Sequence, residues 1–177
     1  MSSTAKSLLN SFTNIATSFA TNADTIDKAS KKYDVSVEQW QRGSYIWEQL
    51  SGDANLYGSI LSSLSGISAN VVTENARLAR TLQFLGLTFE DLKNLDSEEQ
   101  LDVFMEALRS CETDAERVAL ATKLFGSNIG PWMAEMAVIG SSAIGEWNKE
   151  LEKAGILTEK EIETGKNSPG YIDFRFY

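Results

Sequence analysis

The chain has 177 residues, 42% of them hydrophobic and 23% charged, which is the composition of a folded globular protein. Its formal charge of −9 argues against direct binding to nucleic acid, because phosphate contacts need clustered Lys and Arg. The chain contains no histidine, which excludes Ser-His-Asp and Cys-His catalysis and histidine-containing zinc sites, and it has no glycine-rich phosphate loop, so we expect neither an enzyme nor a bound cofactor or metal.

The fold class follows from the residues that favour and break helices. Only two prolines are present, Pro131 and Pro169, and the rest of the chain is rich in Ala, Leu, Glu and Ser. This predicts an all-α protein with a bundle or hairpin of long helices, a cluster of short capped helices and an extended C-terminal tail. The single Cys111 cannot form an internal disulfide, which fits synthesis in the cytoplasm. No apolar run reaches about 18 residues, so no membrane-spanning helix is expected.

Residues 1–33 predict an amphipathic, coiled-coil-like helix. Apolar residues recur along it at steps of four and three: Leu8, Phe12, Ile15, Phe19, Ile26, Ala29 and Tyr33. Such a narrow seam needs a partner helix, so its first four residues, Leu8 to Phe19, are candidate interface residues, and self-association is expected. Asn22 also falls on the seam, where it either fixes the register or lies at the edge.

Residues 34–85 predict a helical hairpin. At the start of its first helix, Ser36 can act as N-cap with Gln39 as its reciprocal partner, and Val35 can contact Trp40. Four aromatic residues lie close together in this region: Trp40, Tyr45, Trp47 and Tyr57. We interpret Trp40 and Trp47 either as residues of a ligand pocket or interface, or as core anchors whose role is burial.

A second apolar stripe predicts one helix of about 30 residues as the other half of this hairpin. Its members are Leu56, Ile60, Leu64, Ile67, Val71, Leu78, Leu82 and Leu85. Gly58 and Gly66 lie within the stripe and weaken the helix, so it depends on packing against the preceding helices.

Residues 86–165 predict a module of short helices, each with its own start signal. The expected N-cap and partner pairs are Thr88 with Asp91, Asp96 with Glu99, Thr113 with Glu116, and Thr158 with Glu161. Gly86 and Gly126 are placed to end helices, and Pro131 to begin one. The sequence between Gly86 and Gly126 contains ten acidic residues and four basic ones. One interpretation is that these acids form a docking face for a basic partner or bind a divalent cation. The other is that they form a solvated surface and stabilise helix N-termini through the helix dipole.

Residues 166–177 predict an extended or disordered tail. The stretch from Tyr171 to Tyr177 alternates aromatic and polar residues, which is typical of a strand. A single strand has no sheet to join in an all-α chain, so the tail is either disordered or pairs with another molecule.

The residues from Thr81 to Met136 carry a family resemblance. The order LGLTFEDLKNL, SEEQLDVFMEAL and then DAERVALATKLFG resembles a segment of the tail tape measure proteins of long-tailed phages and prophages. A weaker resemblance lies upstream, from Tyr33 to Trp40. The members of this family are typically many hundreds of residues long, so the resemblance implies a segment or a truncated form of such a protein.

The resemblance implies a structural role in tail length determination, tail assembly and DNA ejection. The implied partners are tail tube protein, tail assembly chaperones and other copies of the chain, and the implied locations are the virion tail and the host bacterial cytoplasm during assembly. The alternative is a bacterial helical adaptor module that binds a protein partner through the aromatic residues around Trp40 and Trp47.

Overall fold

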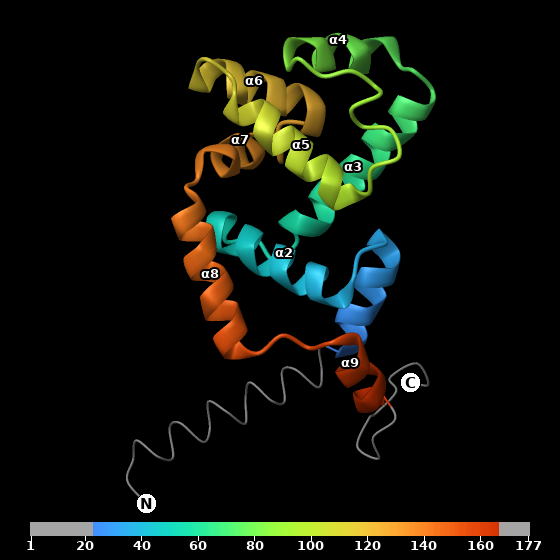
Figure 1. Cartoon of the computed structure of the whole chain (residues 1–177), viewed down its shortest axis with the longest axis vertical. Coiled ribbons are helices and arrows are strands. Elements are labelled where there is room, and N and C mark those ends of the chain that lie inside the picture. The colour runs from blue at the N-terminus through green and yellow to red at the C-terminus, as the bar shows by residue number, and fades with distance from the viewer. Residues whose placement is uncertain (1–22, 167–177) are drawn as a thin grey trace, which may run out of the picture. The chain divides into compact units, whose positions relative to one another are not determined.

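The computed structural model describes residues 23–166, and all regular structure within this range is helical (Figure 1). Helical residues 23–33 are followed by α2 (Val37–Ser51), α3 (Leu56–Val72), α4 (Ala76–Phe84), α5 (Ser97–Arg109), α6 (Asp114–Phe125), α7 (Gly130–Val138), α8 (Ser141–Ala154) and α9 (Glu159–Lys166). The all-α prediction is therefore confirmed for this part of the chain. The proposed seam residues Leu8, Phe12, Ile15 and Phe19 and the tail from Tyr171 to Tyr177 lie outside the described residues.

The described chain divides into two compact units. One unit contains the residues up to Arg42 and those from Ala154 onward, and the other contains Gly43–Lys153. The division between Arg42 and Gly43 falls inside α2, so this helix contributes residues to both units. The first unit is consequently made from two stretches that are far apart in the sequence.

The first unit has a small apolar core. Val37, Ala23 and Ile162 are buried in it, and Ile26 and Leu157 pack against them. The side-chain amide of Gln41 joins the two stretches, because its Nε2 donates to the Leu157 carbonyl at 2.7 Å and its Oε1 accepts from the Leu157 amide at 3.0 Å. This pair of hydrogen bonds between the Gln41 side chain and the Leu157 backbone connects α2 to the segment before α9.

The start signals of α2 and α9 form as predicted. The Gln39 amide donates to Ser36 Oγ at 3.0 Å, and the Ser36 amide donates to Gln39 Oε1 at 2.7 Å. In α9 the Thr158 amide donates to the Glu161 carboxylate at 2.8 Å, and the Glu161 amide donates to Thr158 Oγ1 at 3.3 Å. Both are capping boxes, in which two backbone donors at the helix start are satisfied by side chains.

The prediction of one helix across residues 56–85 is wrong. Helix α3 ends at Val72, and α4 begins at Ala76. Glu74 adopts a left-handed φ of 50°, and the Asn75 amide donates back to the Asn70 carbonyl at 3.0 Å. The Asn75 side chain then accepts from the first amides of α4. Asn75 thus bonds to the end of α3 and caps α4. The apolar stripe continues across this junction, so periodicity alone does not reveal the break.

The prediction of a helix starting at Thr88 is also wrong. The Thr88 amide and hydroxyl both donate to the Asp91 carboxylate at 2.7 Å, but the residues that follow form only turns. Asn94 has a left-handed φ of 64°, which ends the helical path after one turn. The cap signal is therefore present without a helix behind it. In contrast, the capping box of Asp96 and Glu99 at the start of α5 is confirmed.

The core of the Gly43–Lys153 unit lies between α3, α4, α5, α6 and α7. Its most deeply buried large side chains are Tyr57, Ile60, Leu61, Leu64, Leu82, Leu92, Phe104, Leu108 and Met133. Helix α7 packs against both α5 and α6 (Figure 1). A Cβ atom added at Gly130 would lie 2.5 Å from the Cα of Thr122, so only glycine lets α7 begin this close to the α6 backbone. Pro131 occupies the first turn of α7, as predicted.

Candidate functional site

The two tryptophans proposed from the sequence lie in different units of the chain. Trp40 belongs to the first unit and stacks on Tyr33, with ring centroids 5.3 Å apart and planes 8° apart. Trp47 belongs to the Gly43–Lys153 unit and is only 4% exposed, which agrees with its interpretation as a core anchor. The adaptor interpretation therefore loses Trp47 as a contact residue, since a side chain buried in this way offers little surface to a partner.

Tyr57 is the most enclosed aromatic residue of the same region. It is 1% exposed, and its hydroxyl donates to the Glu98 carboxylate at 3.1 Å, which joins α3 to α5. Burial and the neighbouring Glu98 carboxylate raise the pKa of the Tyr57 phenol far above its ordinary value. Gly43 makes room for the ring, because a Cβ atom there would lie only 2.2 Å from its Cζ atom.

Gln100 fixes the turn that precedes α5. Its side chain is buried, its Nε2 donates to the carbonyls of Leu92 and Leu95 at 3.3 and 3.4 Å, and its Oε1 accepts from Ser68 Oγ at 2.9 Å. Beside these contacts lies a first groove of about 290 Å³ between α3 and the turn. Val72 at this groove is 83% exposed, so the groove presents an apolar edge to solvent.

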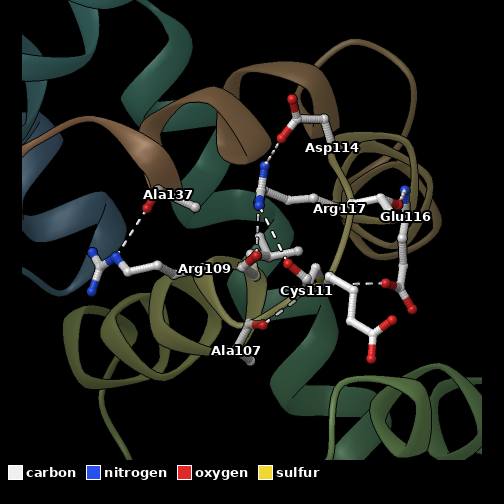
Figure 2. Close-up of polar contacts among 10 residues, drawn as sticks. Ala107, Arg109, Cys111, Asp114, Glu116, Arg117 and Ala137 are labelled. Atoms are coloured by element: carbon white, nitrogen blue, oxygen red, sulfur yellow. Dashed lines mark hydrogen bonds and ion pairs between the residues drawn. The ribbon is translucent and has the colours of Figure 1, made fainter.

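Arg117 joins α6 to the end of α5, as Figure 2 shows. The residue is 8% exposed, its Nε donates to the Leu108 carbonyl at 2.9 Å, and one of its terminal nitrogens donates to the Cys111 carbonyl at 3.4 Å. Its other terminal nitrogen forms an ion pair with Asp114, whose side chain is 94% exposed. The guanidinium thereby adds a donor to the Leu108 carbonyl in the last turn of α5, which also accepts from the Cys111 amide, and to the Cys111 carbonyl just after this helix.

Arg109 makes the equivalent contact at the end of α7. Its Nε donates to the Ala137 carbonyl at 3.0 Å (Figure 2), and its terminal nitrogen pairs with Glu106 at 2.6 Å. A positive charge near the C-terminus of a helix is favourable, because the partial negative charge of the helix dipole lies there. Two arginines therefore hold the α5, α6 and α7 segments together through backbone carbonyls.

Cys111 is half-buried in the link between α5 and α6. Its Sγ lies 3.8 Å from the Ala107 carbonyl in hydrogen-bonding geometry, and burial raises the pKa of the thiol (Figure 2). A raised pKa lowers the fraction of the reactive thiolate form at neutral pH. Burial and the Glu116 carboxylate outweigh the opposite effect of the Arg117 guanidinium on the pKa of this thiol, so the arrangement favours a packing role for the side chain.

A second groove, of about 480 Å³, lies on α3, α4 and α6 of the Gly43–Lys153 unit. Its lining includes two basic side chains, Arg77 and Lys123, which is unusual in a chain with a net charge of −9. Neither Trp40 nor Trp47 lines either groove. Within residues 23–166, no cluster of three or more carboxylates or thiols converges in a way that could hold a metal ion. In the same range no helix combines the length and the apolar character needed to cross a membrane.

Several of these contacts were not foreseen from the sequence. Arg117 and Gln100 occur in helical stretches where charged and amide residues are normally exposed, so their type suggests a surface position. The only available signal for Gly43 and Gly130 was a glycine placed in or at the start of a helix, where it is unfavourable unless space requires it. Comparisons of the chain with models of protein families, with curated proteins and with solved structures found no match.

Proposed function

We propose that the chain is a structural component of a phage tail, as a segment or truncated form of a tape measure protein. The supporting observation is that the stretches resembling this family also contain the main packing residues of one helical unit. Leu92 in LGLTFEDLKNL is 1% exposed, Phe104 in SEEQLDVFMEAL is fully buried, and Phe125 in KLFG packs edge-to-face on Phe104 at 5.4 Å. Similarity at buried positions favours a shared structural role, because packing restricts which side chains fit there.

In this proposal the chain acts through contacts and length rather than through a reaction. Residues 1–33, which the sequence predicts to be helical, would associate with other copies through the predicted seam from Leu8 to Phe19, in a bundle of long helices. The capped short helices form a separate module, and tail tube protein and tail assembly chaperones are the further partners. The chain is then present in the host bacterial cytoplasm during assembly and in the virion tail afterwards.

Purified particles provide the direct test of this proposal. Tailed particles released from the host bacterium are banded on a density gradient, and their proteins are identified by mass spectrometry. We expect peptides of this chain to follow the tail tube protein through the gradient, while an abundant host cytoplasmic protein stays behind as the contamination control. Finding the chain only in the particle-free fractions of a culture that makes intact tails would contradict the proposal.

The seam is tested separately by light scattering after size-exclusion chromatography. Replacing Phe12 and Phe19 by serine removes two apolar contacts, so the variant is expected to elute with the mass of a monomer, whereas the unchanged chain elutes as an oligomer. A monomeric mass for the unchanged chain at micromolar concentration would refute self-association through this seam.

A further inference from the structure

The groove on α3, α4 and α6 is a basic surface in an acidic protein. Arg77 is in the first turn of α4, Lys123 is in the last turn of α6, and both side chains are exposed at the groove. The lining also contains three apolar residues, Ile67, Leu78 and Leu124. The groove thus combines two positive charges with three apolar side chains in a mostly polar lining. Charged groups orient a bound partner, and apolar contacts add affinity.

Unlike three other cations of the same unit, the two cations of this groove have no acidic partner in the described part of the chain. Lys93, Arg109 and Arg117 each form an ion pair with an acidic residue three positions away. Over residues 23–166 no carboxylate lies within ion-pair distance of the Arg77 guanidinium or the Lys123 ammonium. Their charges are therefore not neutralised within the described chain, although acidic residues outnumber basic ones overall.

The polar atoms at the groove also favour an occupant rich in hydrogen-bond acceptors. The Asn75 Oδ1 atom already accepts from the backbone amides of Arg77 and Leu78, at 3.0 and 3.1 Å. The Nδ2 donor is the part of this amide that is left for a ligand, and Asn75 lines the same groove as Arg77 and Lys123. An occupant with carboxylate or phosphate oxygens would complement these three groups.

An exposed aromatic ring adjoins the basic groove. Phe84, at the end of α4, is 70% exposed, and the Lys123 ammonium lies 5.6 Å from the centre of its ring. This cation–π contact places the ammonium next to a large apolar surface. Exposed aromatic residues beside charged groups are enriched at the energetic centres of protein interfaces.

We propose that this groove binds an acidic peptide segment of a partner protein. Its carboxylates pair with Arg77 and Lys123, and one of its apolar side chains packs on Leu78, Leu124 and the ring of Phe84. A nucleic acid fits less well, since two cations do not form an extended phosphate track and the chain carries a net charge of −9. That net charge does not prevent local pairing, because charges are screened beyond about 10 Å at ionic strengths of about 0.1 M. The inference is independent of the phage-tail proposal.

The test is fluorescence anisotropy with the full chain and a short fluorescein-labelled peptide in which glutamate alternates with leucine. We expect binding that weakens as NaCl rises from about 50 mM to about 500 mM, because exposed ion pairs are screened. The double variant Arg77→Glu/Lys123→Glu is expected to bind at least about 10-fold more weakly, since it places carboxylates opposite carboxylates. Phe84→Ala is expected to weaken binding by about 3-fold or more without changing its dependence on salt.

The matched control is Lys149→Glu/Lys153→Glu on α8, which changes the net charge by the same amount away from the groove. We expect it to bind within about 2-fold of the unchanged chain, because neither lysine lines the groove and long-range charge is screened. Circular dichroism verifies that both double variants retain their helices.

Any one of the following outcomes would overturn the proposal. The first is peptide affinity that stays the same in the Arg77→Glu/Lys123→Glu variant, and the second is an equal loss in the α8 control. The third is equal binding of a peptide in which glutamine replaces glutamate, which would remove the role of charge. The fourth is tighter binding of single-stranded DNA than of the acidic peptide, or no peptide binding at concentrations up to about 1 mM.

Discussion

Gly43 and Gly66 are both glycines inside helices, but only Gly43 lies against a neighbouring side chain. A Cβ atom at Gly43 would lie 2.2 to 2.6 Å from three ring atoms of the buried Tyr57, whereas nothing lies within 4 Å of the same position at Gly66. We expect Gly43→Ala to lower the free energy of unfolding by about 2 kcal/mol, because the core cannot accept the extra atom without shifting the ring. Gly66→Ala should raise it by about 0.5 to 1 kcal/mol, since alanine favours the helix.

Urea denaturation followed by circular dichroism measures both glycine variants under the same conditions. Helix propensity alone would raise the free energy of unfolding of both variants. A decrease for Gly43→Ala together with an increase for Gly66→Ala therefore identifies close packing at Gly43. An increase in stability for Gly43→Ala would mean that α2 does not lie this close to Tyr57.

Arg117 is a charged residue whose removal affects several backbone groups at once. Arg117→Ala leaves the carbonyls of Leu108 and Cys111 without this donor in a buried region, at a cost of about 2 kcal/mol or more. Its salt-bridge partner Asp114 is 94% exposed, so Asp114→Asn should cost less than about 1 kcal/mol. Urea denaturation of the two variants measures the difference, and equal losses would show that the carbonyl contacts between α6 and the end of α5 add nothing to the ion pair within α6.

At the scale of elements, the α3–α4 junction carries a residue in an unfavourable backbone conformation. Glu74 has a φ of 50°, a region that costs a residue with a Cβ atom about 1 kcal/mol and costs glycine little. Glu74→Gly is therefore expected to raise the free energy of unfolding by about 0.5 kcal/mol, after the greater freedom of glycine in the unfolded chain is subtracted. Glu74→Ala keeps the Cβ atom and is the control, so a gain in both variants by urea denaturation would exclude the backbone as the cause.

The start of α9 makes a prediction about pH. The Thr158 amide and hydroxyl both donate to the Glu161 carboxylate, and these bonds lower the pKa of its carboxyl group. A lowered folded-state pKa stabilises the helix start above the ordinary glutamate pKa, and this contribution disappears as the pH falls through the lowered value. Thr158→Val should move the Glu161 pKa back towards its ordinary value in a titration followed by carbon-13 NMR, and an unchanged pKa would rule out the hydroxyl bond.

Local signals along the chain predicted helix starts better than they predicted helix lengths. Ser36, Asp96, Thr113 and Thr158 all cap helices as the sequence indicates, because a cap depends on residues within one turn of each other. Thr88 has the same signal but is followed by turns, since Asn94 leaves the helical conformation and the Leu92 and Leu95 carbonyls bond to Gln100. The carbonyl partners of Gln100 and Arg117 lie five to nine residues before them, outside the helix that carries each side chain. A signal that spans one helical turn does not reach them, so these contacts could not be predicted.

At the scale of the whole molecule, the two units differ in how much apolar surface their described residues bury. The first has three buried apolar residues, Ala23, Val37 and Ile162, and the second has a much larger core. We expect amides in residues 23–33 and in α9 to exchange hydrogen faster than those in α5, because less burial opposes local opening. Hydrogen exchange with mass spectrometry measures this, and equal protection in both units would contradict it.

A substitution tests whether the two units open independently. Val37→Ala removes apolar contacts from the first unit only and should accelerate exchange in residues 23–33 and α9. Protection of α5 is expected to stay the same, because its core residues belong to the other unit. Faster exchange in α5 by the same factor would mean that the chain opens as a single cooperative body.

The bond between Gln41 and Leu157 sets an order of events on the ribosome. The two residues are 116 positions apart, so at about 10 residues per second roughly ten seconds pass between the synthesis of one and of the other. During this interval the unit Gly43–Lys153 can fold as it emerges. Val37 and Ile26 remain exposed, because Ile162, against which they pack, has not yet been synthesised. A chaperone that binds the nascent chain would therefore contact the apolar residues between Ala23 and Val37 and would be displaced when α9 packs on them.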